Sequence, residues 1–203
     1  MALSNYAELQ TALTAWVDSR SDVTNLDADV VRLAESHFNL ELRARQMLTS
    51  TDLTPSSGSV TLPSDFLGAY SVVEKATPRR VLQYYGKEHL ESNFDTTISG
   101  LAVGYTIIGS SLTMAPQPSN DIELTYYQEI PNLEANSTNW LMTKYPALYL
   151  ETCQMEVYRN LKMDTDLQIS SQRVENMIKR LNASSDNELL SMATSVNNVG
   201  PVF

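Results

Sequence analysis

Cys153 is the only cysteine of the chain, and its side chain is the one most suited to nucleophilic catalysis. A thiolate nucleophile needs a neighbouring base, but the two histidines, His37 and His89, lie far from Cys153 in the sequence and in no local motif. Residues 144–163, "KYPALYLETCQMEVYRNLKM", are apolar on more than one side of a helix. A cysteine buried in such a helix packs as a small hydrophobic side chain. We therefore predict that Cys153 is an interior packing residue.

Metal and cofactor motifs are also missing from the sequence. One cysteine and two separated histidines cannot form a Cys/His zinc site. The acidic segment 18–29, "DSRSDVTNLDAD", lacks the central glycine and the final glutamate of a calcium-binding EF-hand loop. The seven glycines form no phosphate-binding loop. Glu151 and Glu156 would lie about 140° apart around a helix, so they are no facing pair. We predict no catalytic, metal-binding or cofactor-binding residue, and a protein that is not an enzyme.

Composition indicates a soluble, acidic protein of 203 residues. The formal net charge is −10, which argues against a protein that grips nucleic acid through its phosphates. Residues 1–120 carry 13 acids and 8 bases and residues 121–203 carry 11 and 6, so the negative charge is evenly spread. No apolar run approaches the roughly 18 residues that span a bilayer, and the first residues do not resemble a secretory signal. We expect no membrane association, and a single cysteine fits a reducing compartment.

Four helices are predicted from the spacing of apolar residues and from capping residues. Asn5 and Glu8 form a capping pair at the start of the first helix, and Asp27 can cap the second. Pro146 suits the first turn of a helix, where its missing N–H is not needed. The predicted helices cover residues 4–19, 27–48, 145–163 and 166–183. The apolar stripe expected on the second consists of Val30, Leu33, Ala34, His37, Leu40, Ala44 and Leu48.

The middle of the chain has strand character, because it is rich in Val, Ile, Thr and Tyr and is interrupted by Pro and Gly. "YTIIGSSLTM" predicts a tight hairpin, and "DIELTYYQ" alternates like a half-buried strand. Strands are expected at Ser59–Leu62, Ala69–Lys75, Arg80–Tyr84, Tyr105–Ile108, Ser111–Met114 and Asp121–Gln128, with a short helix in "YGKEHLESNF". Together they predict an antiparallel β insertion over residues 58–130.

The predicted fold class is therefore α+β: mainly an α-helical bundle with a central antiparallel β insertion. Residues 1–185 are expected to form a single domain. After Ser184 the sequence becomes rich in Ser and Asn, so residues 186–203 are expected to form an extended C-terminal arm. Its apolar residues, Val199, Val202 and Phe203 among them, could dock on another surface.

Two groups of residues are candidates for contacts between proteins. The helix predicted at residues 145–163 carries two apolar stripes and so needs two neighbours; its candidate packing residues are Leu148, Tyr149, Cys153, Met155, Val157, Tyr158 and Leu161. The tyrosine pairs of "QYYGK" and "TYYQEIP" would place one ring on each face of a strand; they are Tyr84, Tyr85, Tyr126 and Tyr127. Exposed tyrosines suit protein contacts, whereas strand tyrosines can equally pack under loops.

The order of these segments resembles a known family. Short N-terminal helices precede "LPSDFLGAYSV", the hairpin "YTIIGSSLTMAPQP" leads into "IELTYYQEIPNL", and "NWLMTKYPALYLETCQMEVYRNLKMD" comes before the last helix. This arrangement resembles the adaptor, or head-to-tail connector, proteins of tailed bacteriophages. The resemblance covers roughly residues 1–185 and is most specific from the hairpin to Tyr158.

The resemblance implies a structural protein of the virion, located at the head-tail junction and assembled in the cytoplasm of the bacterial host. Such proteins form a homo-oligomeric ring, a dodecamer, below the portal protein and join it to a tail nozzle or tail tube protein, while DNA passes through the channel without specific binding. One stripe of the 145–163 helix would then contact a neighbouring subunit. The four tyrosines would meet the tail or a neighbour. The candidate portal contacts, by position, are Val196, Val199, Pro201, Val202 and Phe203.

Two other functions remain open from the sequence. The first is a structural protein of the phage tail or baseplate that never contacts the portal. The second is a virion-associated hydrolase that uses acidic residues, which would require a pair of carboxylates in one cleft.

Overall fold

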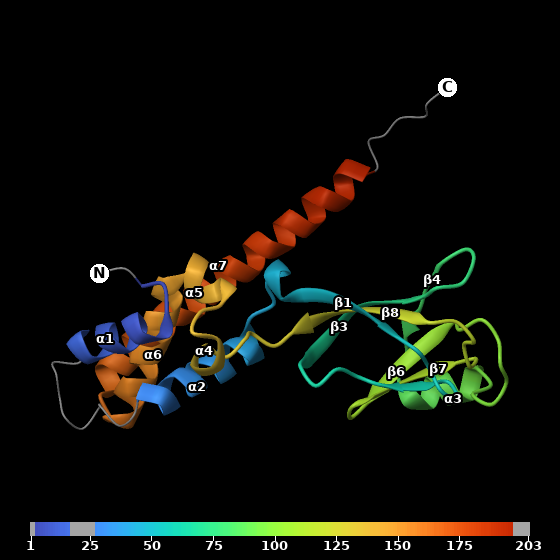
Figure 1. The fold of residues 1–203 in the computed structure, drawn as a ribbon, viewed down its shortest axis with the longest axis horizontal. Helices are drawn as coiled ribbons and strands as arrows, with labels where there is room; N and C mark the ends of the chain where they lie inside the picture. The colour runs from blue at the N-terminus through green and yellow to red at the C-terminus, as the bar shows by residue number, and fades with distance from the viewer. Residues whose placement is uncertain (1–2, 17–26, 197–203) are drawn as a thin grey trace. The chain divides into compact units, whose positions relative to one another are not determined.

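The computed structural model describes residues 3–16 and 27–196 of the chain, which form an α+β protein with helices and two β-sheets. The sequence predicts a single domain, but the chain divides into two compact units (Figure 1). Residues 1–46 and 130–203 form the first, called here the helical unit. Residues 47–129 form the second, called here the β unit.

The helical unit is organised around one central helix. Its helices are α1 (Tyr6–Trp16), α2 (Asp27–Glu41), α4 (Leu133–Asn136), α5 (Trp140–Lys144), α6 (Pro146–Asn160) and α7 (Asp164–Val196). Helix α6 packs against α1, α2, α5 and α7, and nine of its 15 residues are buried. The two apolar stripes of α6 are therefore covered by several helices of its own chain. Pro146 lies in its first turn, as the sequence predicts.

Helix α2 is shorter than predicted and turns a different face inward. It ends at Glu41, where the Arg43 guanidinium donates hydrogen bonds from Nη1 to the carbonyl oxygens of Asn39 and Leu42, 2.9 and 2.6 Å away. These bonds satisfy carbonyls that have no partner within the helix. The expected stripe is wrong at two positions, because Leu33 and Leu40 are exposed. The buried side consists of Val30, Val31, Ala34, Glu35 and Phe38.

Helix α7 is longer than predicted. It continues from Asp164 to Val196, so residues 186–196 are helical and not part of an extended arm. Its 33 residues correspond to a length of about 50 Å. In Figure 1 its later turns, in red, extend beyond the other helices of the unit. Residues 197–203, the rest of the expected arm, lie outside the described part of the chain.

The β unit contains two four-stranded sheets. Its strands are β1 (Leu48–Leu53), β2 (Ser59–Thr61), β3 (Phe66–Glu74), β4 (Arg80–Val81), β5 (Gln83–Tyr84), β6 (Gly104–Ile108), β7 (Ser111–Ala115) and β8 (Ile122–Gln128). One sheet has the order β1-β8-β3-β4 and the other β2-β7-β6-β5. All pairs are antiparallel except β5–β6, which is parallel and corrects the expectation of a purely antiparallel insertion. The predicted short helix is present as α3 (Lys87–Asn93).

The β unit also begins earlier than predicted. Strand β1 starts at Leu48, ten residues before the expected boundary, and pairs along its length with β8. Between α2 and β1 the chain forms a single 3₁₀ turn, η1 (Arg45–Met47), where the sequence predicts continued helix. The sequence of β1, "LTSTDL", is mostly polar because this strand lies at the edge of its sheet.

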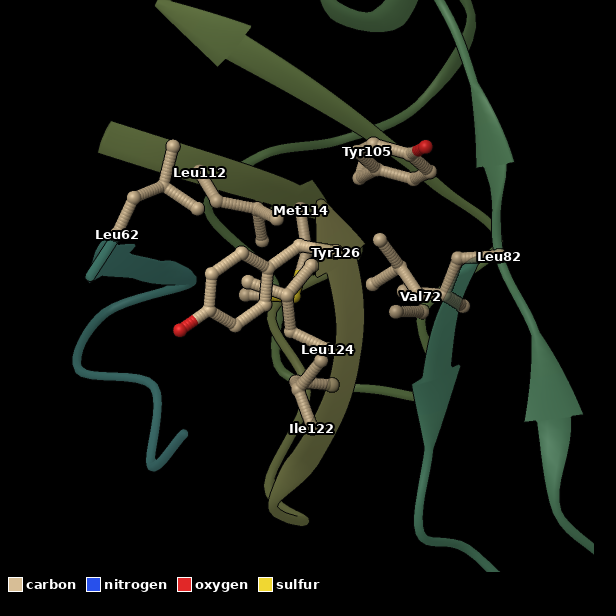
Figure 2. Packing of buried hydrophobic residues seen from close by; sticks show 10 residues of the cluster. Leu62, Val72, Leu82, Tyr105, Leu112, Met114, Ile122, Leu124 and Tyr126 are labelled. Atoms are coloured by element: carbon tan, nitrogen blue, oxygen red, sulfur yellow. The ribbon is translucent and has the colours of Figure 1, made fainter. Parts of the chain in front are cut away.

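An apolar core fills the β unit. Strand β8 alternates buried and half-buried positions, and its side chains Ile122, Leu124 and Tyr126 enter the core. Figure 2 shows them packed with Leu112 and Met114, which come from β7 in the other sheet. One carboxylate is buried in the same unit: Glu74 accepts hydrogen bonds from the Ala102 backbone N–H and the Asn120 side chain, each 3.0 Å long.

Candidate functional site

Cys153 lies at the centre of the helical unit and is completely buried on α6. The two histidines belong to different units: His37 is half-buried on α2, and His89 lies on α3 with its ring stacked on Tyr85. Within residues 3–16 and 27–196, no three His, Cys, Asp or Glu side chains are grouped so that they could hold a metal ion. In the same part of the chain, no helix is both long and apolar enough to cross a membrane.

The candidate packing residues of α6 are covered mainly by their own chain. Leu148, Tyr149, Cys153, Met155 and Val157 are each buried in the helical unit, and Phe38 of α2 meets the Tyr149 ring edge-on at 4.9 Å. The other two candidates, Tyr158 and Leu161, are half-buried. Of the seven, these two therefore have the most surface to offer a neighbouring subunit.

A buried polar cluster joins three segments of the helical unit. Glu35 of α2 accepts a hydrogen bond from the Leu133 backbone N–H at 2.8 Å and another from the Tyr149 hydroxyl at 3.3 Å. Asn139 donates from its amide nitrogen to the Tyr149 hydroxyl and to the Pro131 carbonyl, both at 2.8 Å. These bonds tie residues 131–139 to α2 on one side and to α6 on the other.

The pKa shifts in this cluster are consistent with a role in holding the structure together. Burial raises the pKa of Glu35, although the hydrogen bonds from Leu133 and Tyr149 oppose the shift. Burial also raises the pKa of Tyr149 far above the ordinary value, so its hydroxyl keeps its proton and remains a donor. A carboxylate held by a backbone N–H and a neutral tyrosine has no paired acid or base for catalysis. The cluster therefore holds α2 and α6 in position relative to residues 131–139.

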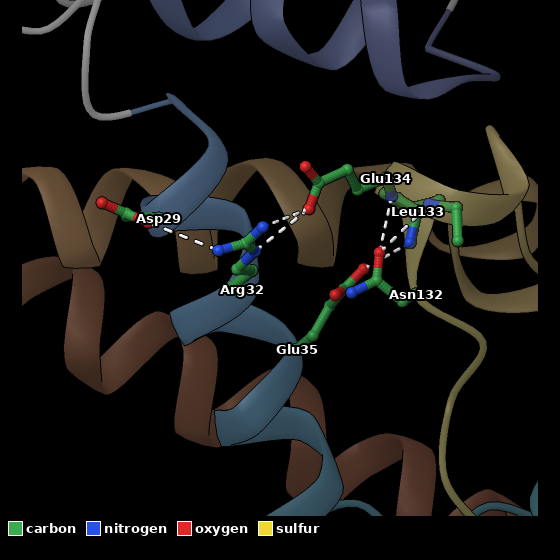
Figure 3. Close-up of polar contacts among 7 residues, drawn as sticks. Asp29, Arg32, Glu35, Asn132, Leu133 and Glu134 are labelled. Atoms are coloured by element: carbon green, nitrogen blue, oxygen red, sulfur yellow. Dashed lines mark hydrogen bonds and ion pairs between the residues drawn. The ribbon is translucent and has the colours of Figure 1, made fainter.

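The surface beside this cluster is held by charged and capping contacts. The guanidinium of Arg32 donates to Oε2 of Glu134 from Nε at 3.0 Å and from Nη2 at 2.8 Å (Figure 3). Asn132 caps α4, because its side-chain oxygen accepts hydrogen bonds from the backbone N–H groups of Glu134 and Ala135. The sequence patterns did not reveal helix α4, nor Glu35, which is not part of the apolar stripe expected on α2.

The later turns of α7 are attached to the end of α2. Asn182 accepts a hydrogen bond from the Arg43 backbone N–H at 2.9 Å and donates one to the Glu41 carbonyl at 3.0 Å. Six residues further along α7, Glu188 binds Arg45 with an Nε to Oε2 distance of 2.8 Å. Helix α7 is therefore held as far as its seventh turn. The candidate portal contacts begin beyond these bonds: Val196 is the last residue of α7, and Val199, Pro201, Val202 and Phe203 lie outside the described residues.

The four candidate tyrosines of the β unit occupy different environments. Tyr84, 62% exposed, is the most accessible, whereas Tyr126 is buried and donates a hydrogen bond to Asp65 at 3.0 Å. Tyr85 and Tyr127 are half-buried. The Tyr127 ring meets Tyr70 edge-on at 6.1 Å, on the other face of the strand from Tyr126. Tyr126 is therefore a core residue of the β unit.

Other large apolar side chains of the β unit are exposed besides Tyr84. They are Val81 on β4 and, in the segment before β6, Ile98, Leu101 and Val103. Gln83 of β5 donates a backbone hydrogen bond to the Val103 carbonyl, which places the loop beside the strand. Exposed apolar side chains beside an edge strand, such as Tyr84 and Val103 at β5, are typical of a surface that contacts another protein.

The comparisons with known proteins address the chain as a whole. The sequence matches the family model of the SU10 adaptor protein over residues 4–199, which includes both units. A comparison with curated proteins finds no match. Because the family match covers nearly the entire chain, this protein belongs to the SU10 adaptor protein family, a family of bacteriophage head-to-tail adaptors.

Proposed function

We propose that this structural adaptor protein forms a homo-oligomeric ring, a dodecamer, directly below the portal of a tailed bacteriophage and joins the portal to the tail. The observation that carries the proposal is the family match over residues 4–199. A match to one unit alone would leave the role of the other open. Here the helical unit and the β unit both belong to the adaptor.

The portal side of the adaptor is assigned to the end of α7. This helix runs for 33 residues and is anchored to its own unit through Asn182 and Glu188, which leaves its last turns beyond those anchors. A helix held at its base can present its end to a partner with little loss of conformational entropy. We assign the portal contact to Val196 and to the apolar residues that follow, Val199, Pro201, Val202 and Phe203.

The tail side is assigned to the β unit. Tyr84, Val81 and Leu101 supply exposed apolar area, and a tyrosine ring binds with a small loss of side-chain entropy. The tail nozzle or tail tube protein is the partner of these side chains. The ring channel would carry DNA without gripping it, because a chain of net charge −10 offers few cationic partners to phosphates.

The proposal is tested by binding to purified portal protein from the same genome, measured by light scattering after size-exclusion chromatography. The full-length adaptor should join the portal as a ring-sized complex. Deletion of Val196–Phe203 should leave a folded subunit and weaken portal binding by at least about tenfold, equivalent to about 1.4 kcal/mol.

Tyr84→Ser is the matched control. It should leave portal binding unchanged and weaken attachment of the tail protein. An adaptor that ignores the portal but binds tail tube or baseplate proteins would replace this proposal with the tail-protein alternative.

A further inference from the structure

A pocket of about 250 Å³ opens on the helical unit between α7 and the start of α6. It is lined by Tyr145, Leu148, Met177, Arg180, Leu181 and Ser184. The side chains of Leu148 and Leu181 are buried, so they form an apolar floor. Arg180 is exposed at this pocket and forms no ion pair with any other described residue. The pocket thus combines an apolar floor with a guanidinium that can form an ion pair with a carboxylate.

A complementary surface lies on the outward side of α2. Asp29, Leu33, Ser36 and Leu40 recur at intervals of four, three and four residues and therefore form one stripe along the helix. Leu33 is 54% exposed and Leu40 is 70% exposed. The opposite side of α2, with Ala34 and Phe38, already fills the core. Leu33 and Leu40 therefore do not pack in the core of their own unit.

Asp29 supplies the acidic group of this stripe. Its contact with Arg32 is long, 3.9 Å, and its side chain is exposed. Arg32 is engaged more closely by Glu134, at 2.8 Å. Figure 3 shows Asp29 at the far side of Arg32 from Glu134. The Asp29 carboxylate is therefore available for a second cation, and Arg180 is a cation without an ion-pair partner among the described residues.

The two surfaces face different directions, so one subunit cannot join them itself. The side of α7 that faces α2 carries Glu175, Ile178, Lys179 and Asn182, which line a second pocket with His37 and Glu41 of α2. At 100° per residue, these positions lie roughly 160° around α7 from Met177, Arg180 and Ser184. The outward leucines in turn point away from the core. Contact between the stripe and the pocket therefore requires two copies.

We propose that the α2 stripe of one copy docks into the α6–α7 pocket of the next copy, with Leu33 against the apolar floor and Asp29 opposite Arg180. The occupant is a second copy of this chain, because the chain itself supplies the matching leucines and carboxylate. Contacts that join two different surfaces repeat around an axis and can close into a ring. The inference rests on the ring of the proposed function and identifies the surfaces that build it.

The main test is chemical cross-linking of the full-length protein with a short bis-maleimide. Leu33→Cys combined with Ser184→Cys places one thiol on each surface, and Cys153 remains because it is buried. We expect a ladder of trimers and larger covalent products on a denaturing gel. Either single variant should give dimers at most. Ile169→Cys with Ser184→Cys is the matched control, because Ile169 is exposed on α7 outside both surfaces.

The same samples are analysed with and without portal protein, which separates the two proposals. A ladder without portal binding would support the interface and reject the portal role. Portal binding without a ladder would support the portal role and overturn the interface. Efficient dimers from Leu33→Cys alone would indicate a symmetric α2–α2 contact and would also overturn it.

A second variant set avoids cross-linking. Arg180→Glu changes an exposed residue and should weaken self-association at least tenfold, and adding Asp29→Arg should restore most of that loss. Lys179→Glu makes the same charge change one residue away, on the α2 side of α7, and should have little effect on self-association. Equal losses from Arg180→Glu and Lys179→Glu, or no rescue by Asp29→Arg, would overturn the proposed pairing.

Discussion

The β unit is built from one continuous segment, residues 47–129, whereas the helical unit joins residues 1–46 to residues 130–203. The interior of the β unit is mostly apolar and follows the alternation of its strands. The helical unit instead buries a hydrogen-bonded cluster of Glu35, Asn139 and Tyr149 where its distant segments meet. Apolar contacts lack direction, so a junction between segments far apart in sequence gains a defined register from buried hydrogen bonds.

The largest expected effect is a loss of stability of the helical unit when a buried aromatic ring is removed. Phe38→Ala removes a buried side chain that packs on Tyr149, and we expect it to lower the free energy of unfolding of this unit by about 3–5 kcal/mol. Hydrogen exchange measured by mass spectrometry should show the loss in α2, α6 and α7 and leave β3 and β8 protected. Leu40→Ala, on the exposed side of the same helix, should change stability by no more than about 0.5 kcal/mol. Equal loss of protection in both units would show that they unfold together.

A smaller effect is expected from overpacking in the β unit. A Cβ atom at position 104 would collide with the ring of Tyr85, so Gly104→Ala should destabilise this unit by about 1–3 kcal/mol. Gly68→Ala is the control, because its Cβ would meet nothing within 4 Å. Urea unfolding followed by tyrosine fluorescence measures both variants. Similar stabilities for the two would mean that the Tyr85 ring moves aside without cost.

The smallest effect is a change in pH dependence that is confined to the helical unit. Burial raises the folded-state pKa of Glu35 above its ordinary value, with a further contribution from Glu134 and an opposing one from Arg32. Between the ordinary and the raised value the folded state binds more protons than the unfolded state, so stability falls as pH rises through this window. Glu35→Gln removes that contribution while keeping an oxygen that accepts hydrogen bonds.

The measurement for this prediction is hydrogen exchange of the helical unit in mildly acidic buffers. The wild-type protein should lose protection as pH rises through the window, after correction for the intrinsic exchange rate, and Glu35→Gln should lose less. Peptides of the β unit serve as the internal control and should behave alike in both proteins. Identical slopes in the helical unit would show that Glu35 does not change its protonation on unfolding.

The sequence predicts the β unit better than the helical unit, for physical reasons. Strands β2, β3, β6, β7 and β8 are indicated by alternation and turn residues, and the hairpin of β6 and β7 lies where it was expected. The single strand predicted at Arg80–Tyr84 is wrong, because the structure divides it into β4 and β5, which belong to different sheets. Strand β1 was missed because an edge strand with one open side can be polar. In α2 the observed buried side includes Val31 and Glu35, and a carboxylate becomes tolerable there only through partners about a hundred residues away.

The candidate site was predictable only in part. The interior position of Cys153 followed from the apolar surroundings in its own helix and is confirmed. The true end of α7 was not predictable, because its Ser- and Asn-rich turns are stabilised by contacts of Asn182 and Glu188 with Arg43 and Arg45. The surroundings of Tyr84 depend on the pairing between β5 and β6, a parallel contact that no local pattern indicates.

The pairing of β1 with β8 bears on how this protein can evolve. The chain enters the β unit through β1 and leaves it through β8, and Leu48 lies directly opposite Tyr127. Opposed residues of antiparallel strands are only about 5 Å apart, so a short loop could bridge the two ends. The β unit is therefore an inserted unit that could be removed or replaced without interrupting the helical unit. Recombination between genomes could exchange this unit while the helical unit stays unchanged.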